Sequence, residues 1–447
     1  MVADGSLDAP GREPFPILPP ALFAANVQRA APERWNVKTL VVSHAAATFT
    51  ESKGGADVLA LRHARFLQRA FGPVGYVGIL NPGEIDGLTY FAVRDTDLLS
   101  YDRMGPRMAA IGYLLNHFFR AAKAAFVAHR NCRDFAPDLV ITHTSTATVI
   151  LKTLRPRTPL AYQIHDGLFA HRTVKGAMER LVRFLMNDLL EMAAVRRAQQ
   201  ILCVSSSIEL QLRNAGVPAE KLSVLPFVHG DSSLDEVKRS VVQPSPPPKL
   251  PTTEPFILSV GQQSGRKRFD LLIEAMPLVK SPVHLVLAGD GPLHAHYRAL
   301  VTRLGLADRV HLEQRVSDAT LANLYAHATC YMLVSENEGF PMTFAEAIAY
   351  GCPSLLMCPN IESTAEYPGG LARLIRQIPA PSAIAELMDE AFASALPTAG
   401  ERAAETVRRA PVEGAEDVSV ELKSIYIRIF ARLSISDDSG RALSPAA

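Results

Sequence analysis

The stretch SENEGFPMTFAEAIAYG, residues 335–351, decides the fold that we expect for this chain. The apolar run before it is typical of a buried strand, Gly-Phe-Pro is a turn, and an apolar helix begins after the turn. Strands that lead into helices in this way build parallel sheets covered by helices. The amides of Met342 and Thr343, at the start of the helix, have no intrahelical acceptor and can bind an anion such as a diphosphate.

Two glutamates flank the turn and the start of this helix. Glu338 and Glu346 are eight residues apart, which on a helix would separate them by roughly 12 Å. This distance exceeds the roughly 5–9.5 Å between the paired carboxylates of a glycoside hydrolase. We therefore expect the two carboxylates to bind hydroxyl groups at two ends of one long ligand.

Short β-branched runs alternate with longer amphipathic runs over most of the chain. This alternation predicts two Rossmann-like α/β domains, at residues 37–234 and 256–400, with parallel sheets that face each other across a cleft. The Pro-rich residues 235–255 are predicted to be the interdomain linker. The expected strands lie at residues 37–44, 75–80, 138–145, 160–166, 201–206 and 221–227, and then at 256–261, 284–291, 309–314, 330–335 and 353–358.

The two ends of the chain differ from the domains between them. Residues 1–36 show no apolar period and are predicted to be a tail. An apolar period inside residues 401–434 predicts a C-terminal amphipathic helix, followed by a second tail at residues 435–447. The residues of this period are Val418, Leu422, Ile425, Ile429 and Leu433.

Composition excludes several classes of protein. The 447 residues are 48% hydrophobic and 20% charged with a net charge of +1, which is ordinary for a soluble enzyme and does not favour nucleic acid as a partner. Five scattered cysteines without a C-x-x-C pair indicate a reducing compartment and no structural metal. The sequence contains neither an apolar run of the roughly 18 residues that a membrane span needs nor a signal-peptide pattern. We therefore expect a cytoplasmic protein.

The first domain is basic. Residues 37–231 carry 23 Lys and Arg against 16 Asp and Glu. Two interpretations are open: a basic surface without a partner, and peripheral contact with an anionic membrane at the inner face or with a polyanionic acceptor. The membrane contact is expected at the apolar residues 181–195 and at the arginines in and beside them, Arg180, Arg183, Arg196 and Arg197.

Segment 335–351 resembles the signature of retaining glycosyltransferase family 4 of the GT-B fold, the glycosyl transferases group 1. In that signature a Glu, seven residues and a second Glu precede an A-x-G-x-P-type stretch, here AIAYGCP at residues 347–353. The resemblance implies that Glu338 contacts the transferred sugar and Glu346 the ribose hydroxyls. Further donor contacts are expected from the turn and the helix start, at Gly339, Phe340, Met342 and Thr343.

A second segment, SVGQQSGRKRFDLLIEA at residues 259–275, resembles the family element G-R-x-x-x-x-K-G-x-D-x-L-I-x-A. Gly261 and Lys267 fall in register with it, and a lysine there can neutralise the leaving diphosphate. The arginine of the family element is Gln262 here, so Arg266 and Arg268, which flank Lys267, are the nearest cations that can replace the missing charge. Gly265 beside Arg266 could let the backbone turn this arginine inward. A family glycine after the third strand of this domain is likewise Gln314.

The first domain resembles the family more loosely, and the resemblance as a whole covers about residues 37–375. Gly54 and Gly55 match a glycine-rich loop that approaches the donor, although a plain strand–helix turn would also use them. His165 matches a histidine at a strand end near the donor sugar, with Asp166 as its orienting partner, although a structural role is equally compatible with this position.

The resemblance implies transfer with retention of anomeric configuration, without a metal or cofactor. The substrate would be a nucleotide-sugar, expected to be a UDP- or GDP-sugar, and the acceptor a sugar, a lipid-linked glycan or a small molecule. Two alternatives are a nucleotide-sugar epimerase of the same architecture and a catalytically silent binding scaffold. An NAD enzyme is the weakest alternative, because Gly289 and Gly291 supply only two of the expected glycines.

Overall fold

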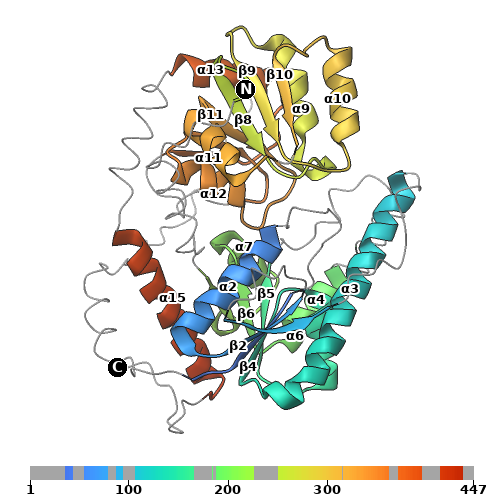
Figure 1. Cartoon of the computed structure of the whole chain (residues 1–447), viewed down its shortest axis with the longest axis vertical. Helices are drawn as coiled ribbons and strands as arrows, with labels where there is room; N and C mark the ends of the chain where they lie inside the picture. Colours follow the sequence, from blue (N-terminus) through green and yellow to red (C-terminus); the bar gives the residue numbers. More distant parts are fainter. Residues whose placement is uncertain are drawn as a thin grey trace, which may run out of the picture.

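The computed structural model describes residues 36–43, 55–78, 87–93, 106–165, 184, 188–225, 250–314, 316–361, 371–394 and 413–435. Within these ranges the chain forms two α/β domains, which lie one above the other in Figure 1. Each domain is built on one parallel sheet, as the alternation in the sequence predicts. The predicted tails, apart from Asn36 and Ile435, and residues 235–249 of the predicted linker lie outside the described ranges.

The N-terminal domain contains a seven-stranded sheet in the order β3-β2-β1-β4-β5-β6-β7. Its strands are β1 Thr39–Val42, β2 Val74–Gly78, β3 Thr89–Ala92, β4 Leu139–Thr142, β5 Leu160–Ile164, β6 Gln200–Cys203 and β7 Leu222–Val224. Its helices are α2 Gly55–Phe71, α3 Pro106–Phe135, α4 Ser145–Leu154, α6 Leu189–Arg197 and α7 Ser206–Asn214, with the short 3₁₀ helix η4 Ala219–Lys221.

The C-terminal domain contains a six-stranded sheet in the order β10-β9-β8-β11-β12-β13. Its strands are β8 Phe256–Val260, β9 His284–Ala288, β10 Val310–Glu313, β11 Cys330–Val334, β12 Ser354–Met357 and β13 Ala372–Ile375. Its helices are η5 Gly265–Lys267, α9 Phe269–Ala275, η6 Met276–Leu278, α10 His294–Arg303, α11 Asp318–His327, α12 Met342–Ala349 and α13 Pro381–Ala393.

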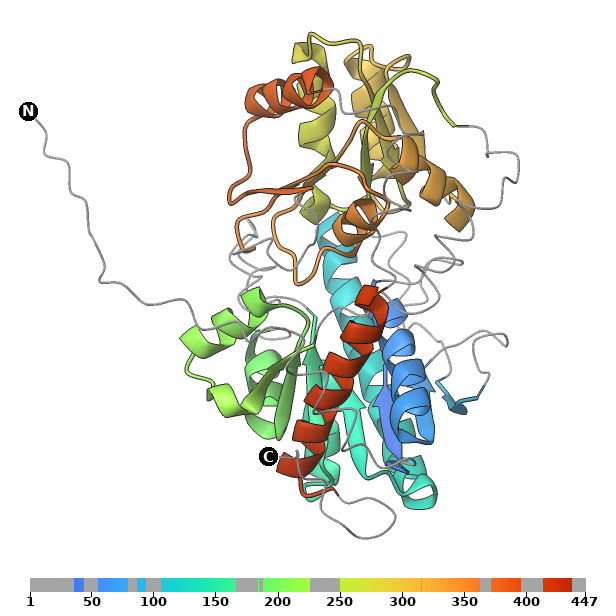
Figure 2. The same cartoon turned by 90° about the vertical axis from the view of Figure 1, so that its left-hand side faces the viewer.

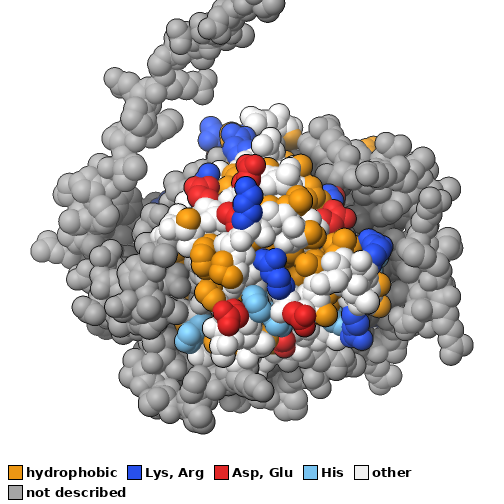
Figure 3. Space-filling model, turned by 90° about the horizontal axis from the view of Figure 1, so that it is seen from above, with side chains coloured by type: hydrophobic (Ala, Val, Ile, Leu, Met, Phe, Trp, Pro, Cys, Tyr) orange, Lys and Arg blue, Asp and Glu red, His pale blue; other side chains and the backbone are white. Residues whose placement is uncertain are grey.

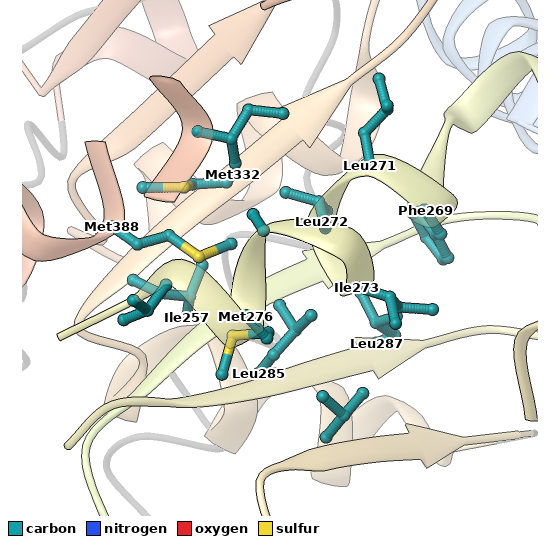
Figure 4. Packing of buried hydrophobic residues seen from close by; sticks show 14 of the residues in the cluster. Ile257, Phe269, Leu271, Leu272, Ile273, Met276, Leu285, Leu287, Met332 and Met388 are labelled. Carbon is teal, nitrogen blue, oxygen red and sulfur yellow. The ribbon is translucent and has the colours of Figure 1, made fainter. Parts of the chain in front are cut away.

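Apolar layers on both faces hold the C-terminal sheet in place. Ile257, Leu285 and Met332 point to the face covered by α9 and α13, where they pack with buried residues of those helices (Figure 4). Leu258 and Leu333 point to the opposite face and pack with residues of α11 and α12. Both faces of a central strand are therefore buried, which explains why these strands are continuous apolar runs in the sequence.

Two edge strands are absent from the sequence-based expectation. β3 and β13 form the outer strands of their sheets and are only partly buried. Both strands are short and contain exposed residues, Thr89 and Ala92 in β3 and Arg373 in β13, so neither shows the continuous buried apolar run by which the central strands are recognised.

The last described helix, α15 Glu413–Arg432, returns from the C-terminal domain and lies along the N-terminal domain (Figures 1 and 2). Its buried side chains Leu422, Tyr426 and Phe430 pack into the core cluster of α2 and the N-terminal sheet. The rings of Phe430 and Phe71 meet edge to face with 5.1 Å between their centroids. Helix α15 is therefore part of the first domain.

The carboxyl ends of the two sheets face each other. The hydroxyl of Ser205, just after β6, donates a hydrogen bond of 2.8 Å to the carbonyl oxygen of Gly339, in the loop after β11. Strand order reverses between β1 and β4 in one domain and between β8 and β11 in the other. Open α/β sheets bind ligands at the carboxyl ends of their strands beside such reversal points.

Candidate active site

Arg266, Lys267 and Glu338 form an ion cluster at the carboxyl edge of the C-terminal sheet. Nζ of Lys267 lies 2.8 Å from Oε1 of Glu338, and Nη1 of Arg266 lies 3.1 Å from Oε2. Lys267 and Glu338 are buried, whereas 43% of the Arg266 side chain is exposed. The cations lie in η5 after β8 and the carboxylate in the loop after β11, so the pairing of adjacent parallel strands brings them together.

The charges of this cluster determine the protonation of Glu338. Burial alone would raise the pKa of the carboxyl group, but the charges of Arg266 and Lys267 and hydrogen bonds from Lys267 and Ser335 lower it to about 2. Burial also lowers the pKa of Lys267, against the opposite effect of Glu338. At neutral pH Glu338 is therefore an ionised hydrogen-bond acceptor and not a proton donor.

Asn360, which follows β12, holds the backbone of Glu338 from both sides. The amide of Glu338 donates to Oδ1 of Asn360 at 2.9 Å, and Nδ2 of Asn360 donates to the carbonyl oxygen of Glu338 at 2.6 Å. The thiol of Cys358 donates to the same Oδ1 at 3.0 Å. The Asn360 side chain thus makes the pair of backbone hydrogen bonds that a neighbouring strand would make, and it fixes the backbone position of Glu338.

Three glycines let the loops around Lys267 approach one another. A Cβ added to Gly261 would lie 3.3 Å from Cε of Lys267, so the glycine leaves room for the lysine stem. At Gly289, whose φ is +129°, a Cβ would lie 2.2 Å from the carbonyl oxygen of Gly261. At Gly291 it would lie 2.6 Å from the backbone of Gln263. Gly289 and Gly291, which motivated the NAD alternative, therefore serve loop packing.

The amino end of α12 lies beside this cluster. The hydroxyl of Thr343 donates to the carbonyl oxygen of Val260 at 3.1 Å, which joins the helix to the end of β8 just before Gly261. Tyr331 lies 2.7 Å from the same hydroxyl. The helix begins at Met342, so the amides of its first turn lie at the carboxyl edge of the sheet, beside the end of β8 that leads to Lys267.

Glu346 lies on α12 and is held by a neighbouring helix. The hydroxyl of Tyr325 on α11 donates to Oε2 of Glu346 at 3.0 Å, and burial raises the pKa of this tyrosine, as does Glu346. Glu346 is partly exposed, unlike Glu338. A carboxylate fixed on a helix with one side open to solvent can accept hydrogen bonds from the hydroxyls of a ligand.

The two glutamines that replace family residues lie at the surface. Gln262 is exposed. Gln314 is exposed as well, and its Nε2 donates to Oδ1 of Asp290 at 2.7 Å. Arg266, in contrast, points its guanidinium toward Glu338 and also donates to the carbonyl oxygen of Asn337 at 2.5 Å. Arg266 therefore brings a positive charge to the site from a different position in the loop.

The N-terminal domain contributes a group of histidines at the carboxyl ends of β4 and β5. Nε2 of His165 lies 2.9 Å from Nδ1 of His143, and the two rings are stacked with 5.1 Å between their centroids. His63, on α2, bonds through Nε2 to the hydroxyl of Tyr426 on α15. Burial lowers the pKa of His63 to about 4; the amide oxygen of Gln163, as a hydrogen-bond acceptor, opposes this shift and the charge of His165 adds to it. His63 is therefore neutral at neutral pH.

The remaining predicted site residues are placed as follows. Gly55 is the first residue of α2, whereas Gly54 and Asp166 lie outside the described residues. Gly339 is buried at the contact with the N-terminal domain, and Phe340 packs against the apolar clusters of both domains. Among the described residues, no group of three or more His, Cys, Asp or Glu side chains is arranged to hold a metal ion.

Several residues of the site were not identified from the sequence. Asn360 and the fully buried Gln263 act through contacts between loops that no local pattern reveals. Gln263 donates through Nε2 to the carbonyl oxygen of Gly289 at 2.7 Å. His143 could have been found, because it ends a predicted strand in the same way as His165.

Comparison with known families identifies both domains. Residues 245–396 match the family described as "Glycosyl transferases group 1", and residues 89–227 match the "Glycosyl transferase 4-like domain". The two matches together take in about two thirds of the chain, with one match in each domain. The chain belongs to the group 1 glycosyltransferases.

A curated relative is similar to part of this group 1 glycosyltransferase. The lipopolysaccharide 1,6-galactosyltransferase of Salmonella typhimurium is 25% identical over 214 residues, 46% of this chain and 57% of the relative. The chain thus spans little more than half the length of this curated relative.

Solved structures confirm the fold. Sucrose-phosphate synthase from Thermosynechococcus elongatus aligns with a TM-score of 0.65 and 19% identity, over 89% of this chain and 99% of that one. Anabaena HepE in complex with UDP-glucose aligns with a TM-score of 0.57 and 17% identity, over 87% of this chain and 100% of that one. The group 1 glycosyltransferase described here therefore has the predicted GT-B architecture of two Rossmann-like domains.

The ion cluster generates a prediction on acid stability. The pKa of Glu338 is lowered from 4.5 to about 2 in the folded protein, so its contribution to stability is present above pH 4.5 and is lost as the pH falls toward 2. Glu338→Gln should lower the free energy of unfolding by about 3 kcal/mol at pH 6. The difference from wild type should shrink between pH 4.5 and 2, as measured by urea denaturation.

The matched control is Glu390→Gln, which removes a carboxylate paired with Arg373 at 2.9 Å on the surface. Exposed pairs are screened by water, so this variant should unfold like wild type over the whole pH range. A pH-independent difference between wild type and Glu338→Gln would contradict the lowered pKa.

Proposed function

We propose that the chain transfers a sugar, with retention of anomeric configuration, from a nucleotide-sugar to an acceptor held against the N-terminal domain. The observation that carries this proposal is the cluster of Lys267, Arg266 and Glu338 beside the amino end of α12. It combines two cations for a diphosphate with an ionised acceptor for sugar hydroxyls. Glu346, farther along α12, supplies the acceptor for the ribose.

The charges divide the work of transfer between these residues. Lys267, Arg266 and the first amides of α12 stabilise the negative charge that develops on the leaving diphosphate, and so take the part that a metal ion plays elsewhere. Glu338 orients the transferred sugar. The acceptor hydroxyl oxygen bonds to the anomeric carbon on the face from which the diphosphate leaves, so the configuration is retained. An oxygen of the departing diphosphate takes the proton of that hydroxyl.

Donor binding must rearrange the cluster. Both cations are paired with Glu338 in the structure, and a diphosphate brings two negative charges to the same place. The diphosphate therefore competes with the carboxylate for Lys267 and Arg266. Glu338 loses part of its pairing at the moment when sugar hydroxyls arrive to replace it, and the exchange selects ligands that carry both a diphosphate and a sugar.

The donor is expected to carry uridine or guanosine. The structure of Anabaena HepE, with UDP-glucose bound, has the same fold, which supports a uridine nucleotide. Both matched families are glycosyl transferases, which favours transfer over the alternatives of an epimerase and a silent scaffold. We propose that no metal or cofactor takes part, because Lys267, Arg266 and the first amides of α12 supply the positive charge that the leaving diphosphate needs.

The acceptor is proposed to be lipid-linked and reached at an anionic membrane surface. α3 packs against α4, and α4 against α6, on one face of the N-terminal sheet. Along α3, Arg130 and Arg133 are exposed and Lys123 is partly exposed, whereas Arg120 is buried and the exposed Asp134 carries the opposite charge. This layer also exposes large apolar side chains, Phe119, Phe126, Leu154 and Leu189, of which Phe126 is 57% exposed.

The charge pattern of this layer distinguishes it from the outer end of the C-terminal domain. There, positive and negative side chains lie interspersed (Figure 3). Exposed aromatic and basic side chains on one layer suit the interface of an anionic bilayer. Of the four arginines predicted for membrane contact, Arg196 and Arg197 lie exposed on α6 and Arg180 and Arg183 lie outside the described residues. No described helix is long and apolar enough to span a bilayer.

The experiment that tests the function is incubation with a panel of UDP-, GDP- and ADP-sugars, with the melting temperature and the products recorded. We expect one nucleotide class to raise the melting temperature and to yield a glycosylated acceptor.

Glu338→Gln should cut turnover at least a hundredfold and keep nucleotide binding. Glu346→Ala should instead weaken the binding of the free nucleoside diphosphate by about 1–3 kcal/mol. Conversion of the donor incubated alone would indicate an epimerase, and binding without transfer a scaffold.

The position of Arg266 generates a prediction about the missing family arginine. Since Arg266 already brings a charge to Glu338, Arg266→Ala should lose nearly as much turnover as Lys267→Ala. Gln262→Arg should raise turnover little, because the charge has been replaced. A gain of tenfold or more for Gln262→Arg, equal to about 1.4 kcal/mol of barrier, would show that the loss of the arginine was not compensated.

The basic layer generates a prediction about membranes. The wild-type protein should sediment with vesicles that contain anionic phospholipid at low salt, and high salt should release it. Phe126→Ser should weaken this binding severalfold, whereas Leu278→Ser, which alters a 51% exposed leucine of the C-terminal domain, should not. Wild-type protein that stays in the supernatant at low salt would indicate a soluble acceptor.

A further inference from the structure

The segment that carries Glu338 is attached to both domains. Glu338 itself is held by the C-terminal domain, through Lys267 and through the two bonds of its backbone to Asn360. The next residue, Gly339, accepts the hydrogen bond from Ser205 of the N-terminal domain, and Phe340 packs against buried clusters of both domains. The attachment thus passes from one domain to the other within three residues.

Ser205 is held in one orientation by its place at the start of α7. It is the N-cap residue of this helix, and its Oγ accepts a hydrogen bond from the amide of Ile208 at 3.3 Å. The hydroxyl has one proton, and because the amide of Ile208 is a donor, this proton is directed to the carbonyl oxygen of Gly339. Ser205 is 3% exposed, so water does not compete for this bond.

A second contact from the same helix reaches the other loop that holds Glu338. Nε2 of Gln211 on α7 lies 3.5 Å from the carbonyl oxygen of Asn360. α7 therefore contacts both neighbours of Glu338, the following residue Gly339 and the bracing residue Asn360. A movement of the N-terminal domain relative to the C-terminal domain therefore acts on the backbone that carries the Glu338 carboxylate.

We propose that Ser205 is a positioning residue for sugar transfer, which couples the approach of the two domains to the placement of the Glu338 carboxylate. This inference rests on the proposed function. A displacement of about 1 Å in a group that orients the reacting sugar is enough to reduce a rate severalfold to a hundredfold. The N-terminal domain, through Ser205, would thus complete a donor site whose groups for the diphosphate and the ribose belong to the C-terminal domain.

Four variants separate the cross-domain bond from the stability of α7. Ser205→Ala loses both the cap and the bond, whereas Ser205→Gly loses the bond and keeps most of the cap, because glycine is an acceptable N-cap residue. Ser205→Thr keeps both hydroxyl functions. The control Ser317→Ala removes the N-cap of α11, where Oγ accepts from the amide of Thr320 at 3.1 Å, without touching the loop of Glu338.

We expect Ser205→Ala and Ser205→Gly to lower kcat about tenfold, which corresponds to about 1.4 kcal/mol of barrier. The Kd for free UDP and free GDP, measured by calorimetry, should stay unchanged, because the contacts proposed for the diphosphate and ribose lie in the C-terminal domain. Ser205→Thr should restore kcat to within twofold of wild type. Ser317→Ala should lower the melting temperature as Ser205→Ala does and leave kcat unchanged.

Two results would overturn the inference. If the wild-type protein transfers sugar and Ser205→Gly turns over at the same rate, the bond to Gly339 does not position Glu338. If Ser317→Ala loses as much kcat as Ser205→Ala, the effect is one of stability. Absence of transfer by the wild-type protein with every donor would instead refute the proposed function, and the inference with it.

Discussion

The buried carboxylate of Glu338 sets the requirements that the loops around it meet. An ionised group that is 4% exposed is stable only when opposite charges and hydrogen bonds replace its water. Lys267 provides the nearest charge, and it must itself be buried to reach the carboxylate. Its stem passes so close to the chain that a Cβ at position 261 would lie 3.3 Å from it, which is a tight contact.

The close approach of three loops follows from this packing. A Cβ at Gly289 would meet the carbonyl of Gly261, and a Cβ at Gly291 would meet the backbone of Gln263. Gln263 fills the space between the loops and bonds the carbonyl oxygen of Gly289. The two glycines that resemble a dinucleotide-binding loop are thus explained by the close approach of this loop to the one that carries Lys267.

The fold and the centre of the site were predictable from the sequence because both depend on short-range patterns. Buried parallel strands are continuous apolar runs, and the segment around Glu338 and Glu346 has a fixed spacing. The edge strands β3 and β13 were missed because they are short and only partly buried, and so lack a continuous apolar run. Asn360 was missed for a different reason, since it acts on a residue 22 positions away through a contact that only the sheet order creates.

Which cation replaces the family arginine at Gln262 depends on where the neighbouring side chains point. The sequence left open which cation of the loop faces the ligand, and the structure directs Arg266 toward Glu338. Arg268 is occupied elsewhere, where it donates to Asp270 at 2.9 Å and lies 3.5 Å from Glu336.

The charge of the site can be followed through donor binding. Two cations and one carboxylate leave one net positive charge before the donor binds, and a diphosphate then brings two negative charges. The site would become net negative, and the positive end of α12 is the group that offsets the excess. Under the proposed function, this balance favours release of the diphosphate after transfer, because among the described residues two cations, Lys267 and Arg266, are paired with Glu338 and no third.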